Sequence, residues 1–386
     1  MKIAIVSKSN SSSGGASHIA SLHAEWLAAK GYDVTHWVSH KSALTGSQTQ
    51  LYGPAVTKFC TTAFKLMQRY RLGPSIPVDL LIQCLPDFSK FDIVHFHDHY
   101  LAFSPQFMQA CASKTKTFFT AHDCLHFTGS QLYETASSRR YWPFEAWARH
   151  VCQKVAQESA LTYIYPSKWL LDLAETKLKF KKQPQHIPNG IDQRTYQPPS
   201  RAKARALLNI PDNRLVVCIA AQSLMDERKG AKYAIAALQA NKVYNPFVLL
   251  IGHQPSPQQQ LALKLNEFDF KCTGYISERK ELGVAYAAAD LTMICSLQDN
   301  LPIIAQESML AGTPLVGFAT GGIPEITNNN ETAWLAPTRD QTALNDALAT
   351  AIKNPQNKGE LAKQYILKHF SREQHVASLI QLYQKA

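Results

Sequence analysis

Two carboxylates flank a mostly apolar run in the C-terminal half of this 386-residue chain. Asp299 and Glu307 lie eight positions apart in the segment QDNLPIIAQESMLAGTPLVG, residues 298–317. A carboxylate can accept hydrogen bonds from two adjacent hydroxyl groups, so each could hold a pair of sugar hydroxyls. Two acids would also suit a glycosidase, in which an acid and a nucleophile lie roughly 5–9 Å apart.

Two adjacent cations, Arg228 and Lys229, precede a glycine and an amphipathic helix in AAQSLMDERKGAKYAI, residues 220–235. Positive charges at the start of a helix oppose its dipole, so this arrangement is unfavourable unless an anion arrives. A diphosphate would relieve the conflict and accept charge-assisted hydrogen bonds. The alternative is a solvated pair in a loop. These cations favour a phosphorylated donor over the plain glycoside of a glycosidase.

A glycine-rich loop, SSSGGASH at residues 11–18, lies between the first expected strand and the first expected helix. Gly14 and Gly15 would let backbone N–H groups approach a phosphate or a sugar, and the helix N-terminus adds positive potential. A plain tight turn is the alternative. The G-x-G-x-x-G spacing of a dinucleotide site is absent, which argues against a dehydrogenase.

Histidines are the other residues that could do chemistry. His95, His97 and His99 in HFHDHY would share one face of a strand, a pattern that could hold a metal. No Cys, Glu or fourth His at matching spacing accompanies them, so we predict no metal site and expect local hydrogen bonds or a place at a cleft. His122, in TAHDCLHFTGS, could donate a hydrogen bond to a phosphate or sugar hydroxyl or shuttle a proton, or could bond only to backbone.

Apolar segments that suit strands alternate with longer segments that suit helices, and this rhythm runs through two halves of the chain. The expected strands are residues 2–7, 91–97, 117–122 and 161–167, and then 215–222, 247–253, 271–276, 291–296, 313–318 and 332–337. A proline-rich stretch, residues 181–214, separates the halves. We therefore predict an α/β protein of two Rossmann-like domains, each a doubly wound parallel sheet, with the ligand beyond the carboxyl ends of the strands in a cleft.

Composition narrows the class of protein. Lysine and arginine exceed aspartate and glutamate by 40 − 29 = 11, but the charge is spread along the chain, so we expect no nucleic-acid partner. No run of roughly 18 apolar residues is present, and the N-terminal sequence lacks the apolar core of a secretion signal. Eight scattered cysteines without a C-x-x-C pair suit a reducing compartment. We expect a cytoplasmic protein.

One segment concentrates positive charge, VTKFCTTAFKLMQRYRLG at residues 56–73. Apolar side chains recur at helical spacing, and lysines and arginine line another face of the expected helix; the apolar set is Phe59, Ala63, Leu66, Met67 and Tyr70. Two interpretations stay open. The helix packs on its own domain, or it lies at the interface with the anionic lipid headgroups of the cytoplasmic membrane face.

Residues 299–326 resemble a known signature. DNLPIIAQESMLAGTPLVGFATGGIPEI is similar to the acid, seven residues, acid pattern and the following glycine turn of glycosyltransferase family 4. Other passages agree in the same order along the chain: GGA, TAHDCLHFTG, YPSKWL, IPNGID, ERKG, TGYIS, AYAAADL and GGIPEI. The resemblance spans nearly the whole chain and is greatest to bacterial enzymes of the colanic-acid type, which build exopolysaccharides.

The resemblance implies a GT-B fold with an acceptor-binding domain at residues 1–190 and a donor-binding domain at 191–370. A final helix at 371–386 would cross back onto the first domain. It further implies retaining, metal-independent transfer of a sugar from a UDP- or GDP-linked donor, without a cofactor. The acceptor would be a hydroxyl of a glycan or a lipid-linked molecule, in the synthesis of capsule or another bacterial surface polysaccharide.

The resemblance also assigns roles to the residues that match the family pattern. Glu307 would bind the ribose diol of the nucleotide, and Asp299, with the backbone of Asn300 and Leu301, would hold the donor sugar and the distal phosphate. Arg228 and Lys229 would neutralise the leaving group. Gly14 and Gly15 would approach the phosphate, and His122 would contact the transferred sugar. Gly274 and Tyr275 would cradle the nucleobase.

Some positions depart from the family pattern. Gln222 stands where the family has the arginine of Gly-Arg-Leu, and whether Arg228 replaces it stays open. Asp299 replaces the commoner glutamate and reaches less far. The competing function is a sugar-nucleotide epimerase of the same architecture, which would need no acceptor. The sequence does not specify the base, the sugar or the acceptor.

Overall fold

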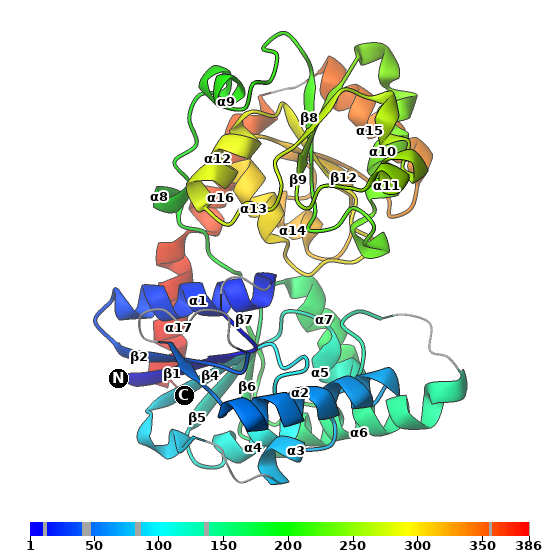
Figure 1. Cartoon of the computed structure of the whole chain (residues 1–386). Coiled ribbons are helices and arrows are strands. Elements are labelled where there is room, and N and C mark those ends of the chain that lie inside the picture. The colour runs from blue at the N-terminus through cyan, green and yellow to red at the C-terminus, as the bar shows by residue number, and fades with distance from the viewer. Residues whose placement is uncertain (11–13, 41–47, 82–85, 135–138, 355–356, 386) are drawn as a thin grey trace. The chain divides into compact units, whose positions relative to one another are not determined.

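The computed structural model describes the chain except residues 11–13, 41–47, 82–85, 135–138, 355–356 and 386. The Ser-rich part of the glycine loop and Cys84 therefore lie outside the described residues. Two compact units make up the rest: residues 1–189 with 375–386, and residues 190–374. Each unit is built around its own parallel sheet (Figure 1).

The first unit has a seven-stranded parallel sheet in the order β3-β2-β1-β4-β5-β6-β7. Its strands are β1 (Lys2–Ser7), β2 (Asp33–Val38), β3 (Gln48–Gln50), β4 (Ile93–His97), β5 (Lys116–Thr120), β6 (Thr162–Tyr165) and β7 (Gln185–His186). In β1, β4 and β5 nearly every side chain is buried, as expected for a parallel sheet covered on both faces. The order reverses between β1 and β4, which is the usual ligand position in such sheets.

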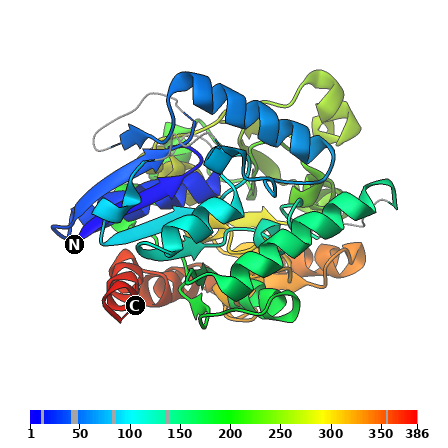
Figure 2. The same ribbon diagram turned by 90° about the horizontal axis from the view of Figure 1, so that it is seen from below.

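Two layers of helices cover this sheet. Helix α1 (Gly15–Ala28) packs with the final helix α17 (Arg372–Lys385) on one face, where the rings of His23 and His375 lie 4.4 Å apart between centroids (Figures 1 and 2). The other helices are α2 (Pro54–Arg69), α3 (Val78–Leu81), α4 (Pro105–Ala112), α5 (Leu125–Thr128), α6 (Trp142–Glu158) and α7 (Lys168–Lys177), with 3₁₀ turns at Phe88–Lys90 and Arg139–Tyr141. Side chains from α4, α6 and α7 share one apolar core with alternate residues of β4 and β6. His95 and His97, at the intervening positions of β4, therefore face α1 and α17.

The second unit has a six-stranded parallel sheet in the order β10-β9-β8-β11-β12-β13. Its strands are β8 (Val216–Ala220), β9 (Phe247–Ile251), β10 (Phe270–Cys272), β11 (Leu291–Ile294), β12 (Leu315–Phe318) and β13 (Ala333–Ala336). The helices are α8 (Gln193–Tyr196), α9 (Arg201–Leu207), α10 (Ala231–Ala240), α11 (Pro257–Ala262), α12 (Arg279–Ala287), α13 (Ile303–Leu310), α14 (Ile323–Ile326), α15 (Gln341–Lys353) and α16 (Lys358–His369), with 3₁₀ turns at Glu227–Lys229, Lys242–Tyr244 and Leu265–Glu267. Here the order reverses between β8 and β11.

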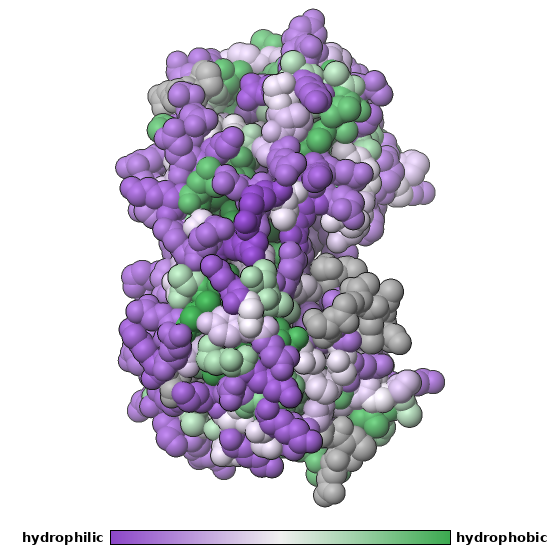
Figure 3. All heavy atoms as spheres, turned by 90° about the vertical axis from the view of Figure 1, so that its left-hand side faces the viewer, coloured by the Kyte–Doolittle hydropathy of each residue, from purple (hydrophilic) through white to green (hydrophobic). Residues whose placement is uncertain are grey.

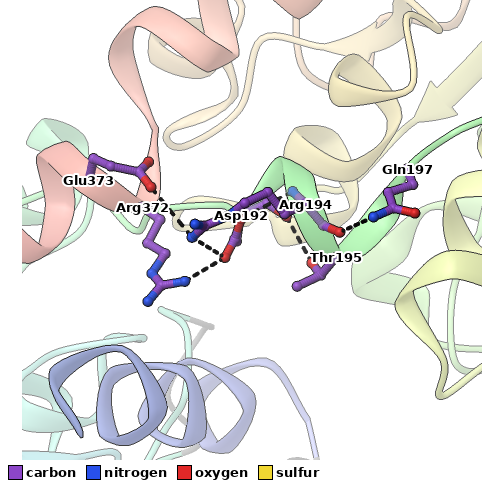
Figure 4. Close-up of polar contacts among 6 residues, drawn as sticks. All are labelled: Asp192, Arg194, Thr195, Gln197, Arg372 and Glu373. Atoms are coloured by element: carbon purple, nitrogen blue, oxygen red, sulfur yellow. Dashed lines mark hydrogen bonds and ion pairs between the residues drawn. The ribbon is translucent and has the colours of Figure 1, made fainter. Parts of the chain in front are cut away.

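Hydrogen bonds within the second unit join the two segments of the chain that continue into the first unit. Backbone bonds join Ile191 N to Phe370 O at 2.8 Å and Arg372 N to Ile191 O at 3.0 Å. The Asp192 carboxylate accepts from both Arg194 and Arg372 (Figure 4). Partial burial opposes ionisation, but these bonds lower the pKa of Asp192 to about 2, so the carboxylate is charged at neutral pH.

The prediction of two doubly wound parallel sheets is confirmed, and every strand expected from the sequence is present to within a few residues. Sequence reasoning missed β2, β3 and β7. None of the seven described cysteines forms a disulfide, and six of them are buried.

The expectation for residues 56–73 is only partly right. A helix is present, but it packs through Cys60, Phe64 and Met67, whereas Phe59 and Leu66 are each 57% exposed. On the face drawn in Figure 3, hydrophilic side chains predominate and hydrophobic ones form small groups among them. Among the described residues, no helix combines the length and the apolar character needed to cross a bilayer.

Candidate functional site

The loops after β8 and β11 bring three of the predicted site residues together in the second unit. Lys229 Nζ donates to Asp299 Oδ2 at 2.7 Å, and Arg228 Nη1 lies 3.6 Å from the same oxygen. Ser296, two residues after β11, also donates to this oxygen at 3.1 Å. The cluster lies where the strand order reverses, because β8 and β11 are neighbours and their carboxyl ends share one edge.

The carboxylate of Asp299 supplies negative charge beside the cations Arg228 and Lys229. Its burial alone would raise its pKa, but Lys229 and Arg228 outweigh that effect and hold the pKa of Asp299 below its ordinary value. Asp226 lies 3.5 Å from Arg228 and contributes a second negative charge. The expectation that only a bound anion could relieve the charge conflict at residues 228–229 is therefore wrong, since the chain supplies carboxylates of its own.

Gly230 lets the two loops approach. Its φ is +67°, and a Cβ there would lie 2.0 Å from the carbonyl oxygen of Cys295, a contact that no side chain can make. The Arg228 carbonyl accepts from Leu297 N at 2.7 Å. A small pocket adjoins Lys229; its other lining residues are Ile219, Ala220, Ala221, Ala231, Ala234, Met293, Ile294, Cys295, Ser296 and Ile304. The site thus combines a cation with a small recess at the strand ends.

Asn300 and Leu301 follow Asp299 directly and are buried just before helix α13. The Asp299 carbonyl accepts from Gly322 N at 3.2 Å, and a Cβ on Gly321 would lie 1.7 Å from that same carbonyl oxygen. The glycine pair after β12 therefore fixes the backbone of the loop that carries Asp299 and Asn300.

Glu307 belongs to a separate cluster on α13. Tyr196 donates to Glu307 Oε1 at 2.8 Å, and Tyr286 donates to Oε2 at 3.2 Å. Burial raises the pKa of Glu307 to about 7, although the two tyrosine hydroxyls favour its charged form. Sequence reasoning missed both tyrosines, because each belongs to a different helix from Glu307, and Tyr196 is 111 positions away along the chain. Glu307 is absent from the lining of the pocket beside Lys229.

Gly274 and Tyr275 follow the edge strand β10. Gly274 has a φ of +77°, and its carbonyl accepts from Gly252 N at 3.1 Å. The ring of Tyr275, which is 51% exposed, stacks on His253 with centroids 5.9 Å apart. His253, two residues after β9, is another residue that the sequence did not single out. The pair offers exposed aromatic surface at the end of the sheet.

The other three predicted residues belong to the first unit. Gly14 has a φ of +96°, and α1 begins at Gly15 without a side-chain cap from any described residue. His122 follows β5, and its Nε2 lies 3.1 Å from Nδ1 of His97. The predicted trio of His95, His97 and His99 does not form a group in this structure: the third histidine beside His95 and His97 is His23.

Two family models divide almost the whole chain between them. The model described as Glycosyltransferase Family 4 matches residues 13–194, and the model described as Glycosyl transferases group 1 matches residues 200–369. The chain belongs to the family 4 glycosyltransferases.

Individual members of the family are distant relatives. The chain is 27% identical over 217 residues to a D-inositol 3-phosphate glycosyltransferase of Saccharomonospora viridis, over 52% of this chain and 49% of that protein. An MMP alpha-(1->4)-mannosyltransferase of Mycolicibacterium hassiacum is 23% identical over 252 residues, 64% of this chain and 58% of the other. The chain thus spans about half the length of the curated relatives it matches.

Solved structures show the same fold. Anabaena Alr3699/HepE, in complex with UDP and glucose, superimposes with a TM-score of 0.72 at 17% identity, and the alignment covers 100% of both chains. At this identity, the likeness shows the GT-B architecture of this family 4 member.

The raised pKa of Glu307 predicts a pH-dependent stability. A carboxyl whose pKa rises from 4.5 to about 7 on folding stabilises the protein fully below its unfolded pKa and loses that contribution as the pH rises through the folded value. Glutamine stays neutral, so the stability of Glu307→Gln relative to the unmodified protein should increase between about pH 5 and pH 8, by up to ~3 kcal/mol. Urea unfolding at several pH values measures this difference.

Glu360→Gln, at an exposed position of the same unit, is the matched control. Its stability relative to the unmodified protein should change little over the same pH range. A Glu307→Gln difference that is equally independent of pH would contradict the assignment of a buried, raised-pKa carboxyl.

Proposed function

We propose that this chain transfers a sugar from a nucleotide diphosphate sugar to a hydroxyl group, with retention of the anomeric configuration and without a metal ion. The observation that carries the proposal is the Lys229–Asp299 cluster at the carboxyl ends of β8 and β11. It occurs in a chain whose two halves both match models of glycosyltransferases.

Lys229 is the proposed contact to the leaving diphosphate. Breaking the sugar–phosphate bond puts positive charge on the anomeric carbon and negative charge on the diphosphate, so a fixed cation beside the diphosphate lowers the barrier. An ammonium group has three N–H donors, so Lys229 can keep its bond to Asp299 while donating to a phosphate oxygen. Asp299 holds the ammonium group in place before the donor binds, which limits reorganisation during the reaction.

The other residues of the second unit are proposed to bind the rest of the donor. Glu307 would accept from the ribose hydroxyls, exchanging its bonds from Tyr196 and Tyr286 for bonds to the diol. Tyr275 and His253 would stack against the base. UDP is the first candidate, because the Anabaena protein was solved with UDP and glucose; GDP stays open. The sequence contains no D-x-D triad, and Lys229 with Arg228 would supply the positive charge that a metal supplies elsewhere.

The acceptor is proposed to be a glycan or a lipid-linked molecule, in bacterial surface polysaccharide synthesis on the cytoplasmic side. In this scheme the departing phosphate oxygen takes the acceptor proton, so no separate base is needed. Gly14 and Gly15 are proposed to approach the phosphate, and His122 is proposed to contact the sugar.

A ligand screen followed by product analysis tests the function. A nucleoside diphosphate that binds the folded protein should raise its melting temperature, and we expect UDP or GDP to do so. The sugar nucleotide with the same base should then support transfer, in excess EDTA, to a product with the donor's anomeric configuration by NMR. An inverted product, or activity that EDTA abolishes, would contradict the stereochemical or the metal-independent part of the proposal.

Replacing Lys229 tests the role of the cation. Lys229→Ala should lower turnover by about 30- to 1000-fold, the loss of ~2–4 kcal/mol of transition-state stabilisation. Lys232→Ala, which removes an exposed lysine from the next helix, is the matched control. Because Lys229→Ala also leaves Asp299 without its nearest cation, melting temperatures must show that the assayed variant is folded. Turnover of folded Lys229→Ala within a fewfold of the control would refute the role.

A second part of the proposal concerns the surface of the first unit. Six of the sixteen described large apolar side chains that are exposed come from α2, its C-cap and α6: Phe59, Leu66, Tyr70, Trp142, Phe144 and Trp147. The two helices meet where the rings of Tyr70 and Phe144 lie 6.4 Å apart between centroids. Both lie on the outer surface of the unit (Figures 1 and 2).

Positive charge accompanies these apolar side chains. The exposed cations of this surface are Lys58, Lys65, Arg69, Arg139 and Arg140, and the described residues of α2 include no acidic side chain. Glu145, in the first turn of α6, is buried and lies 3.5 Å from Arg71. Exposed tryptophans beside lysine and arginine suit the headgroup region of an anionic membrane. We therefore propose that α2 and the start of α6 dock on the membrane that carries the acceptor.

Vesicle binding tests this surface. The protein should sediment with vesicles that contain phosphatidylglycerol, and much less with pure phosphatidylcholine or at high salt. Leu66→Glu combined with Trp147→Glu should weaken binding by about tenfold or more, since each introduced charge opposes insertion. Leu261→Glu, at an exposed leucine of the second unit, should bind as the unmodified protein does. Equal binding by both variants would refute this surface as the contact.

A further inference from the structure

Three buried histidines and the half-buried His122 form a row in the first unit, beside the layer of α1 and α17. His375 Nε2 lies 2.5 Å from His23 Nε2, and His23 Nδ1 lies 3.2 Å from His97 Nε2. His97 Nδ1 lies 3.1 Å from Nε2 of His122, the residue assigned to the sugar. At the far end, His375 Nδ1 lies 2.6 Å from the carbonyl oxygen of Pro188.

Each imidazole of the row is neutral at physiological pH. Burial lowers the pKa of His122 to about 3 and that of His375 to about 4. Burial also holds the pKa of His23 and His97 well below the ordinary value, and neighbouring histidines act in the same direction. A neutral imidazole carries one hydrogen, so one ring nitrogen donates and the other accepts.

The Pro188 carbonyl fixes the direction of every bond in the row. A carbonyl oxygen only accepts, so His375 carries its hydrogen on Nδ1 and must accept at Nε2. His23 therefore donates from Nε2 and accepts at Nδ1, and His97 does the same. His122 must then donate from Nε2 to His97, which leaves Nδ1 of His122 without a hydrogen. The carbonyl oxygen of Pro188 thus determines the tautomer of His122, which lies three hydrogen bonds beyond His375.

A metal ion is the main alternative for this cluster. The nearest ligand nitrogens of His23, His95 and His97 lie within 4.8 Å of one another. However, both nitrogens of His23 and of His97 are used in the row. Those of His95 contact the hydroxyls of Tyr383 at 2.5 Å and Thr120 at 2.7 Å. Because every nitrogen of the three rings has a hydrogen-bond partner, the arrangement favours a hydrogen-bonded row over a metal site.

We propose that His375, His23 and His97 are positioning residues, which hold His122 as a hydrogen-bond acceptor toward the transferred sugar. The proposal rests on the proposed function, because that function places the sugar at His122. A group that meets Nδ1 must then bring its own hydrogen, which a sugar hydroxyl does and a phosphate oxyanion does not. This differs from the sequence-based expectation that His122 donates a hydrogen bond or shuttles a proton, because the row ends at a carbonyl that cannot take a proton.

The tautomers can be read directly in the unliganded, full-length protein. Two-bond ¹H–¹⁵N correlation spectra of histidine-labelled protein at neutral pH should show His122, His97 and His23 with the hydrogen on Nε2, and His375 with the hydrogen on Nδ1. An Nδ1–H or imidazolium form of His122 would overturn the proposal. So would a stoichiometric metal in the purified protein, found by elemental analysis, with metal-shifted resonances of His23 and His97.

Two substitutions at His375 separate positioning from packing. Glutamine can still accept from His23 through its amide oxygen, so His375→Gln should keep the His122 tautomer. His375→Phe fills the space but removes both bonds, so a second His122 population with Nδ1–H should appear. In His375→Phe the KM for the donor should rise by roughly tenfold, about the value of one hydrogen bond, while kcat changes little. His150→Gln, at an exposed histidine of the same unit, should change neither quantity.

Unchanged His122 resonances in folded His375→Phe would refute the row as the determinant of the tautomer. The spectra need no substrate, so they distinguish this proposal from the proposed function. The predicted tautomers in a protein that transfers no sugar would support the row and reject the function. Sugar transfer by a protein whose His122 carries its hydrogen on Nδ1 would support the function and reject the row.

Discussion

A buried carboxylate, Asp299, is the constraint on which the candidate donor site depends. Only 7% of this residue is exposed, and an unpaired charge in such a place costs several kcal/mol. Lys229 and Ser296 offset this cost through short bonds to the same oxygen. The loops after β8 and β11 must therefore stay together, and their contact requires the glycine at position 230. The cation that would meet a diphosphate is thereby fixed before any ligand arrives.

The two units offset the cost of burying polar groups in different ways. The second unit keeps charges and pairs them, so its electrostatic field can act on a ligand. The first unit keeps its histidines neutral and joins them in a row with one consistent direction. Neutral rings exert a weaker field, but they define donor and acceptor positions. In the proposed function, the paired charges stabilise the leaving group and the neutral row recognises hydroxyls.

Local pattern in the sequence was sufficient to predict two units with parallel sheets, and it placed Lys229 and Asp299 in loops that follow strands. Fully buried strands such as β8 appear in the sequence as apolar runs, whereas β3 and β7 are too short for such a signal and β2, DVTHWV, alternates with polar residues. The contact between Lys229 and Asp299 was predictable in outline, because both follow parallel strands. Tyr196 and Tyr286 carried no signal that links them to Glu307. On α2, helical spacing alone did not show which of two apolar stripes, Phe59 with Leu66 or Phe64 with Met67, faces the protein.

The histidine row explains why the division of the chain by sequence differs from its division by contacts. The family model for the first half ends at residue 194, yet His375, from the last helix, belongs to the first unit and is bonded to both Pro188 and His23. Pro188 precedes the point where the chain leaves the first unit, and His375 is where it returns. The hydrogen bond between His375 and Pro188 therefore joins the two ends of the first unit's chain segments and also starts the row that ends at His122. The contact between His375 and His23 joins residues 352 positions apart, so no local sequence pattern predicts it. The folded structure shows that the last helix contributes to the histidine row of the first unit.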